Sequence, residues 1–249
     1  MRPAVDALEA RTRVVTFSLC GEPGTDAAFG NDATFDAQVE QVERAMDREG
    51  IERAVICGVS YGGLVALRFA ATRPERTAGL VLVSTPPPSW ELDRTQQGYV
   101  ERPIWSAPAF IARAPRRLWP EIRSASGSFV PDAWFTLRHL ARVIAAPMSP
   151  SRMARRVRLA RAVDLAADCA RVTAPTLVVT GEPALDRVVP VGGTHRYLEA
   201  IRGATAATIE RTGHIGLVTR PERFAEVVTE FAQDVAHQGT RGNARSAAG

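Results

Sequence analysis

The sequence predicts an α/β protein built on a mostly parallel sheet with helices on both faces. Short runs rich in β-branched residues, typical of strands buried on both faces, occur at residues 54–57, 79–84 and 175–180. Segments with apolar residues at helical spacing alternate with these runs, which favours a parallel sheet. Between residues 90 and 170 the strand pattern is absent, and arginine-rich helical pieces broken by prolines replace it. We therefore expect one core sheet with a helical insert after the strand that ends near Ser84.

The chain before residue 54 predicts the first elements of this core. Residues 3–10 have helix-like spacing, and residues 13–18 have the composition of a strand. A glycine-rich loop follows. A second helix is predicted from residue 35 to Gly50, because glycine readily adopts the left-handed conformation that ends helices. The apolar face of that helix consists of Phe35, Val39, Val42 and Met46.

The segment around Ser60 predicts a strand, a tight turn and a helix. Residues 54–57 form the strand, in which Cys57 is expected to be a small core residue. Helical spacing follows the turn and stops before Pro74. A serine on so sharp a turn is strained, and its hydroxyl is exposed at the carboxyl edge of the sheet. The turn itself is Gly58-Val59-Ser60-Tyr61-Gly62-Gly63.

The insert at residues 90–171 predicts a helical lid. It follows a strand at the carboxyl edge of the sheet, so it is expected to lie over a site on that edge. All four tryptophans of the chain lie in this insert. Trp90, Trp105 and Trp134 are expected to line an apolar substrate pocket, although packing within the small core of the lid itself remains an alternative for each of them.

After the insert, the sheet resumes with the strand at residues 175–180 and a loop at 181–190. A short strand at residues 206–209 precedes a turn that contains His214, and Pro221 stands at a plausible first helical position. The Gly/Ser/Arg/Ala-rich chain from His237 is expected to be disordered. The predicted divisions are residues 1–89 and 172–236 for the two parts of the core, 90–171 for the lid and 237–249 for a disordered tail.

Composition and charge exclude several classes of function. The start of the chain lacks the apolar core of a signal peptide and no 18-residue apolar run is present, so a cytoplasmic protein without an integral membrane segment is expected. The three cysteines have no metal-like spacing. All 31 basic residues are arginine, which excludes a lysine base or Schiff base. Residues 91–171 hold 14 arginines against 7 acidic residues, but not in a recognisable nucleic-acid-binding module, so no nucleic-acid partner is expected.

A serine nucleophile needs a base within hydrogen-bonding reach, and the base needs a partner that orients it. His214 alone among the four histidines follows a predicted strand end, in a Gly-His turn able to reach the sheet edge. Asp186, in the loop after a strand on the same edge, is our choice for the orienting acid, and Glu182 is the runner-up. The order serine, acid, histidine is the one that this turn architecture uses. The other histidines are His139 in the insert, His195 in or before a helix and His237 in the tail.

These motifs resemble the α/β-hydrolase family. The resemblance rests on the turn 58–63, the loop 181–190, and Thr212-Gly213-His214 followed by residues 220–224, and it covers roughly residues 11–90 and 172–236. Within the family the chain is similar to small soluble esterases, lactonases and haloperoxidase-like members with a helical lid. The resemblance implies Ser60 as nucleophile, His214 as base and Asp186 as orienting acid. It also implies that the Tyr61 backbone N–H is one oxyanion donor and that no cofactor is required.

The front of the chain departs from this resemblance. Family members have three strands ahead of the one predicted at residues 14–18, and the loop after the third supplies the second oxyanion donor. Losing one donor costs about 10²–10³ in rate. The third strand normally lies between the strand at 14–18 and the strand before Ser60, so its absence is expected to open a gap in the sheet.

Two explanations of this departure are open. In the first, Met1 is an internal methionine of a longer natural chain. In the second, residues 14–18 occupy the third-strand place, and residues 19–24 act as the oxyanion loop with Cys20 in place of histidine. We favour the first, because the helix at residues 35–49 leads into the strand before Ser60, as expected after the fourth strand of the family.

The resulting functional hypothesis is a serine hydrolase that cleaves a carboxylic ester or lactone of a small, largely apolar substrate through an acyl-enzyme. One alternative is acyl transfer or carbon–carbon bond hydrolysis by the same three residues. Another is a catalytically impaired member of the fold that binds a ligand without turnover. The expected partner is a small-molecule substrate, and a homo-oligomer is compatible with the sequence.

Overall fold

The computed structural model describes residues 2–20, 34–89, 91–92, 94–105, 108, 119–121, 123–124 and 150–246. Its centre is a four-stranded parallel sheet in the order β1-β2-β3-β4, which confirms the predicted fold class. Because all four strands run in one direction, the loops that follow them meet at a single edge of the sheet. The strands are β1 (Ala54–Val59), β2 (Thr77–Val83), β3 (Thr176–Thr180) and β4 (Thr205–Thr208).

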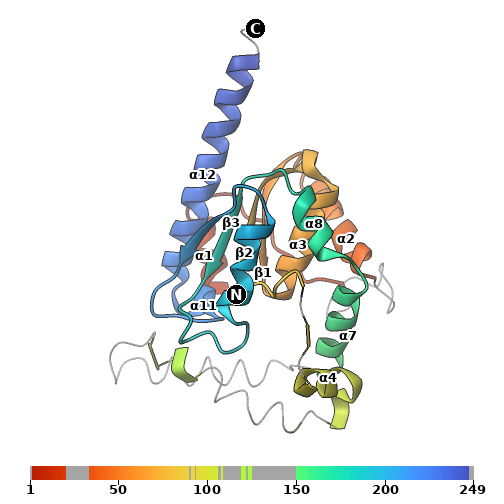
Figure 1. The fold of residues 1–249 in the computed structure, drawn as a ribbon. Coiled ribbons are helices and arrows are strands. Elements are labelled where there is room, and N and C mark those ends of the chain that lie inside the picture. Colours follow the sequence, from red (N-terminus) through yellow and green to blue (C-terminus); the bar gives the residue numbers. More distant parts are fainter. Residues whose placement is uncertain are drawn as a thin grey trace.

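Helices cover both faces of this sheet (Figure 1). One face carries α2 (Phe35–Arg48), α3 (Tyr61–Thr72) and α8 (Leu165–Arg171). The other carries α1 (Arg2–Glu9), α11 (Gly216–Thr219) and α12 (Pro221–Ser246). Although the predicted division places α8 in the lid, its residues Leu165 and Cys169 belong to the same buried cluster as α3. The core is therefore a three-layer α/β/α arrangement.

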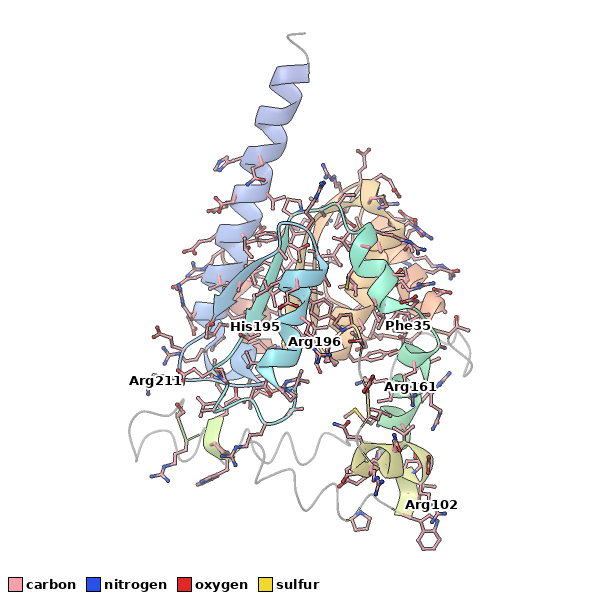
Figure 2. All side chains as sticks on the ribbon, viewed as in Figure 1. Phe35, Arg102, Arg161, His195, Arg196 and Arg211 are labelled. Carbon is pink, nitrogen blue, oxygen red and sulfur yellow. The ribbon has the colours of Figure 1, made fainter. Side chains whose placement is uncertain are left out.

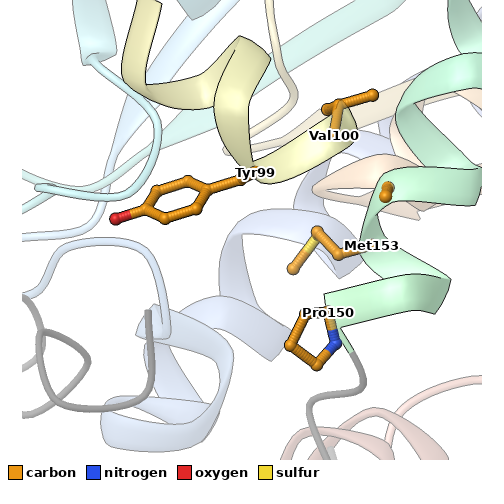
Figure 3. A pocket seen from close by; sticks show the side chains of 5 residues that line it. Tyr99, Val100, Pro150 and Met153 are labelled. Atoms are coloured by element: carbon orange, nitrogen blue, oxygen red, sulfur yellow. The ribbon is translucent and has the colours of Figure 1, made fainter. Parts of the chain in front are cut away.

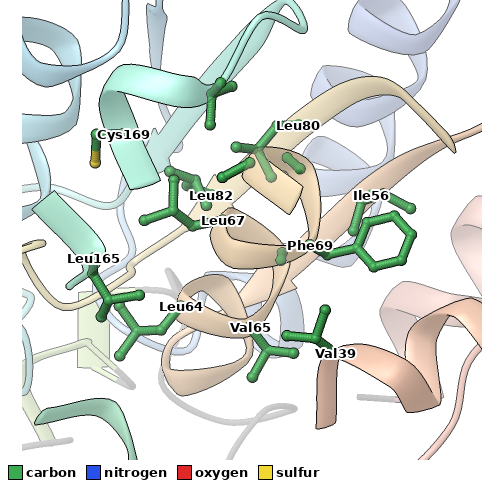
Figure 4. Packing of buried hydrophobic residues seen from close by; sticks show 14 of the residues in the cluster. Val39, Ile56, Leu64, Val65, Leu67, Phe69, Leu80, Leu82, Leu165 and Cys169 are labelled. Carbon is green, nitrogen blue, oxygen red and sulfur yellow. The ribbon is translucent and has the colours of Figure 1, made fainter. Parts of the chain in front are cut away.

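The side chains of β2 alternate in direction, so this one strand contributes to the buried clusters on both faces of the sheet. Leu80 and Leu82 pack with α3, as Figure 4 shows, whereas Val81 and Val83 pack with α12 on the opposite face. Successive strand side chains point to opposite faces, so a strand covered on both sides is apolar at every position. This is the physical basis of the continuous apolar runs from which the strands were predicted.

Local signals in the sequence set the ends of α2. The Thr34 hydroxyl accepts a hydrogen bond from the Ala37 backbone N–H at 3.1 Å, which caps the N-terminus. Gly50 follows the helix with φ +63°, the left-handed conformation expected for a glycine at a helix end. These contacts direct the chain into β1.

The remaining helices lie in connections between the strands. The 3-10 turn Pro74–Arg76 precedes β2, and α9 (Val191–Thr194) and α10 (Arg196–Ala200) follow β3. In the insert, α4 (Arg94–Glu101) packs against α7 (Pro150–Arg161), and the pair lies below α3 and α8 in Figure 1. No helix in the described parts of the chain is long and apolar enough to cross a membrane.

The prediction of a strand at residues 13–18 is wrong. This segment pairs with no strand of the described sheet, and its Val15 and Phe17 side chains are 38% and 42% exposed. β1 lies at an edge of the described sheet, and Cys57, expected in the core, is exposed. A β-rich segment forms a strand only where a neighbour completes its hydrogen bonds. The segment is held instead by polar contacts, such as the 2.8 Å ion pair between Arg13 and Glu49.

The end of the chain also differs from the prediction. The chain expected to be disordered from His237 is helical as far as Ser246, as the last part of α12, which projects beyond the body of the protein (Figure 1). No proline interrupts residues 222–246. Once a helix has formed, each further residue adds one hydrogen bond at small cost, so a helix anchored by packing can continue into polar sequence.

Arg68 on α3 ties two neighbouring helices to its own. Its guanidinium donates to Asp36 of α2 at 2.7 Å and to the fully buried Asp168 of α8 at 3.0 Å. We expect Arg68→Met to lower the free energy of unfolding by about 2–3 kcal/mol, because the buried carboxylate would then depend on the exposed Arg171 at 3.4 Å. Urea denaturation measures this change.

The matched control for this prediction is Arg223→Met, because Arg223 forms an ion pair with Glu226 in which both side chains are exposed. Exposed pairs contribute little, so the control is expected to change the unfolding free energy by no more than about 0.5 kcal/mol. Equal losses in the two variants would contradict the role assigned to Arg68.

Candidate active site

Ser60 lies on a strained turn between β1 and α3. Its backbone has φ +52° and ψ −123°, a region that residues with a side chain rarely adopt. Two hydrogen bonds hold this conformation: the Ser60 N–H donates to the Val83 carbonyl at 2.8 Å, and the Gly63 N–H donates to the Ser60 carbonyl at 2.9 Å. The hydroxyl makes no capping bond to α3.

Two glycines allow the close approach of strand and helix at this turn. A Cβ atom on Gly58 would lie 2.4 Å from the Gly62 carbonyl oxygen, and one on Gly63 would lie 2.0 Å from the Thr85 hydroxyl. At Gly62 itself a Cβ atom would meet nothing within 4 Å. The first and last glycines of the motif are therefore required by packing, whereas the middle one is not.

Asp186 and His214 meet at the same edge of the sheet. His214 Nδ1 lies 3.4 Å from Asp186 Oδ2, and both side chains are largely buried. The other oxygen of Asp186 accepts hydrogen bonds from the backbone N–H groups of Val188 and Val189, at 3.0 and 2.9 Å. A carboxylate facing Nδ1 favours the tautomer with its proton on that nitrogen, which leaves Nε2 able to accept a proton.

Glu182, the runner-up for the acid, makes different contacts. Its carboxylate accepts a hydrogen bond from the Arg211 backbone N–H at 2.6 Å, and its own N–H donates to the Thr212 carbonyl at 2.8 Å. Arg211 has φ +60°, so this contact holds a strained residue three positions before His214. The structure thus gives the two carboxylates separate contacts: Asp186 meets the imidazole, and Glu182 ties the loop after β3 to the loop after β4.

Ser60 and His214 follow parallel strands and so lie at the same sheet edge. Among the described residues, no hydrogen bond joins their side chains, and the contact between them stays a prediction. A second histidine, missed at this edge by the sequence analysis, is His195 between α9 and α10. Its Nε2 lies 3.5 Å from the hydroxyl of Thr180, the last residue of β3 (Figure 2).

Tyr61, the predicted oxyanion donor, is the first residue of α3. Backbone N–H groups in the first turn of a helix have no partner within the helix, so the Tyr61 N–H is suited to bind a developing negative charge. The side chain has a separate role. Its hydroxyl donates to Gln38 of α2 at 2.7 Å, and Arg156 of α7 lies over the ring, 5.5 Å from its centre. Burial raises the pKa of the phenol, which therefore remains a donor.

Cys20 does not fit the role of an oxyanion-loop residue. Its backbone N–H donates to the Gln41 side chain at 2.7 Å, and its side chain is buried. The rest of the alternative oxyanion loop, residues 21–24, lies outside the described residues. Since residues 13–18 form no strand, the explanation that places the third strand there has no support from the structure.

The tryptophans predicted to line a pocket do not do so where the structure describes them. Trp105, which follows α4, is 87% exposed. Trp90 and Trp134 lie outside the described residues. A small apolar pocket does lie between α4 and α7, as Figure 3 shows. It is lined by Tyr99, Val100, Pro150, Met153 and Ala154.

The sequence analysis missed Glu121 of the insert. This carboxylate is 1% exposed and contacts the loop that carries His214, through Thr212 and the backbone N–H of Ile215. Burial raises the pKa of Glu121, although the hydrogen bonds it accepts act in the opposite direction. Nothing in the sequence distinguishes this glutamate from the other charged residues of the insert. Among the described residues, no group of three or more histidine, cysteine or acidic side chains is placed to hold a metal ion.

A serine on a strained turn after a parallel strand, with an Asp–His pair at the same edge of the sheet, defines the class of α/β hydrolases. The chain belongs to the alpha/beta hydrolase family, which it matches over residues 3–227. This confirms the resemblance inferred from the motifs.

Three known proteins illustrate the relationship. The chain is 26% identical over 251 residues to a Variovorax paradoxus protein named as a carbamate hydrolase, RutD, with 93% of this chain and 85% of that protein covered. It is 26% identical over 241 residues to the pimeloyl-[acyl-carrier protein] methyl ester esterase of Aliivibrio salmonicida, covering 93% and 86%. A solved meta-cleavage product hydrolase of Pseudomonas fluorescens has 25% identity and a TM-score of 0.68, covering 94% of this chain and 84% of that one.

Proposed function

We propose that the protein is a serine hydrolase that cleaves a carboxylic ester or lactone of a small, largely apolar substrate through an acyl-enzyme. The observation that carries this proposal is the strained Ser60 at the same sheet edge as a histidine paired with a buried carboxylate. Serine is a weak nucleophile at neutral pH, and an adjacent imidazole is the usual means of activating it. Hydrolase names among the relatives, an ester and a carbamate hydrolase, support the same class of reaction.

In this proposal His214 Nε2 removes the proton from the Ser60 hydroxyl while Oγ attacks the substrate carbonyl. The negative charge that develops on the carbonyl oxygen is stabilised by the Tyr61 backbone N–H and the N-terminus of α3. Asp186 stabilises the imidazolium through Nδ1. The imidazolium then gives its proton to the leaving alkoxide, which departs as an alcohol from an ester or stays attached to the acyl group as a hydroxyl from a lactone. His214 next takes a proton from water while the water oxygen attacks the acyl carbonyl, and it returns that proton to Ser60 Oγ as the bond to the acyl group breaks and the acid leaves.

A fluorophosphonate probe tests this proposal whatever the natural substrate is. The serine oxygen displaces fluoride from phosphorus, so a stable adduct marks an activated serine. Peptide mapping by mass spectrometry is expected to find one adduct, on Ser60. Preincubation with a short-chain p-nitrophenyl ester is expected to slow its formation. An unlabelled Ser60 would contradict the proposal and favour a binding protein without turnover.

A second candidate keeps the same three residues and changes the reaction to carbon–carbon bond hydrolysis or acyl transfer. The likeness to a meta-cleavage product hydrolase favours it. Product analysis with and without an alcohol acceptor separates acyl transfer from hydrolysis, because a transferase yields acylated acceptor in preference to free acid. A labelled Ser60 with no turnover of esters or lactones would favour carbon–carbon bond hydrolysis.

A further inference from the structure

We propose that Glu121 is a positioning residue for His214. Glu121 belongs to the insert, and its carboxylate holds the loop at residues 212–215, so the backbone on both sides of the histidine is restrained by a residue outside the core. This inference rests on the proposed function, since it assigns to His214 the role of base. Glu121 itself does not contact the imidazole in the hydrogen bonds that the structure records.

The carboxylate of Glu121 bonds to the loop on both sides of His214. On the N-terminal side, the Thr212 hydroxyl donates to Oε1 at 2.6 Å. On the C-terminal side, the Ile215 backbone N–H is shared between Oε1 at 2.9 Å and Oε2 at 3.1 Å. Hydrogen bonds to an ionised acceptor are short and strong. Two anchors that flank one residue restrict both the position and the direction of its side chain.

The hydroxyl groups of Thr212 and Thr219 lie in one cluster with Glu121. Because Thr212 has one hydroxyl proton and gives it to the carboxylate, its oxygen is left as an acceptor. The Thr219 hydroxyl of α11 can donate to that oxygen at 3.0 Å, to the Ile215 carbonyl at 3.3 Å or to Glu121 at 3.5 Å. Thr212 is fully buried and Glu121 nearly so. Without the carboxylate, the N–H of the half-buried Ile215 would lose its acceptor, and the buried Thr212 hydroxyl would have to bond to Thr219 instead.

A second contact connects the insert to the loop that carries His214. The guanidinium of Arg211, which Figure 2 shows at the margin of the molecule, donates to the Ser124 carbonyl from Nε at 3.2 Å and from Nη2 at 3.1 Å. From the core side, Glu182 holds the Arg211 N–H. The loop that carries His214 is therefore held between the loop after β3 and two residues of the insert, Glu121 and Ser124.

The contact between Asp186 and His214 leaves the imidazole in need of a further restraint. Their separation of 3.4 Å is long for a hydrogen bond to a carboxylate, so Asp186 alone orients the imidazole weakly. Small displacements of a catalytic group have large effects on rate, since reacting atoms have to approach closely. A contact that fixes the backbone on both sides of His214 supplies the missing restraint.

The test uses the whole chain with ¹⁵N-labelled histidine and two substitutions that weaken the contact from either side. Glu121→Gln removes the negative charge and replaces one acceptor oxygen with an NH2 group, and Thr212→Val removes the hydroxyl donor. Glu101→Gln is the matched control, because Glu101 is an exposed glutamate at the end of α4 in the same insert. The first measurement is the pair of ring ¹⁵N signals of His214, assigned by their loss in His214→Ala. The second is the rate at which the fluorophosphonate probe labels Ser60.

In the wild-type chain we expect one His214 tautomer, with its proton on Nδ1. Thr212→Val and Glu121→Gln are each expected to shift or broaden these signals and to slow labelling by about tenfold. The double variant is expected to lose less than the sum of the two single variants, because both substitutions act on the same hydrogen bond between Thr212 and Glu121. Glu101→Gln is expected to match the wild type in both measurements.

Unchanged His214 signals in folded Glu121→Gln and Thr212→Val would overturn the inference, as would effects that simply add in the double variant. If the wild type is not labelled but the His214 signals still respond to both substitutions, the positioning role stands and the proposed function fails. If Glu121→Gln does not fold, the pair Thr212→Ser and Thr212→Val decides. Thr212→Ser keeps the hydroxyl and is expected to preserve the wild-type His214 signals. Equal changes of these signals in Thr212→Ser and Thr212→Val would overturn the role of Glu121.

Discussion

Replacing Ser60 or His214 with alanine is expected to slow ester hydrolysis by about 10⁴-fold or more in each case, and combining the two is expected to add little. The reason is that, in the proposed mechanism, the two side chains act as one unit. Without the imidazole the serine keeps its proton, and without the serine the imidazole has no oxygen to activate. The remaining rate in every variant reflects substrate binding and the Tyr61 N–H alone.

The measurement is kcat/KM for the best ester or lactone substrate, together with circular dichroism to establish that each variant is folded. His195→Ala is the matched control, because His195 also lies at this edge of the sheet but its ring bonds to Thr180. It is expected to retain activity within about threefold of the wild type. The assignment of the base would be contradicted if the rate losses of the two single variants multiplied in the double variant. It would also be contradicted if His195→Ala lost as much activity as His214→Ala.

Gly58→Ala is expected to destabilise the fold by about 3 kcal/mol or more, the largest effect on stability that we predict. The added Cβ would lie 2.4 Å from the Gly62 carbonyl oxygen and 2.5 Å from the Gly63 Cα. Both atoms are backbone, so no side-chain rotation relieves the clash. Strand and helix would have to separate at the turn, and Ser60 would lose the hydrogen bond to Val83 that holds its strained conformation.

The control is Gly62→Ala in the same motif, where a Cβ atom meets nothing within 4 Å and the backbone is helical. Alanine favours helices more than glycine does, so this variant is expected to be neutral or stabilised by up to about 1 kcal/mol. Thermal and urea denaturation of the two variants measure the difference. A Gly58→Ala protein as stable as Gly62→Ala would show that the turn is looser than its geometry implies.

The short-range features of this fold were predictable from the sequence. Leu80, Val81 and Leu82 are apolar in succession because β2 is covered on both faces, and the helix ending at Gly50 has the left-handed glycine expected there. The turn at Ser60 depends on glycines at fixed positions beside it, and those positions can be read directly. The pairing of Asp186 with His214 was also predicted, since parallel strands bring the loops that follow them to one edge.

Features that depend on a distant partner could not be predicted in this way. Residues 13–18 have the composition of a strand, yet they form none, because strand pairing requires a neighbour and no local pattern shows whether one is present. Trp105 is exposed for a similar reason: an aromatic ring is buried only where another element covers it. Glu121 contacts Thr212 across 91 positions of the chain.

The sequence by itself therefore determined the α/β class, the strained turn at Ser60 and the order of the serine, acid and histidine, because each follows from residues near one another in the chain or from the direction of the strands. Only the tertiary structure decided that β1 lies at an edge of the described sheet, that Glu182 bonds to the Arg211 N–H, and that Glu121 of the insert contacts the loop that carries His214. Those outcomes depend on which long-range contacts form, and the energies of such contacts arise only when the chain is packed.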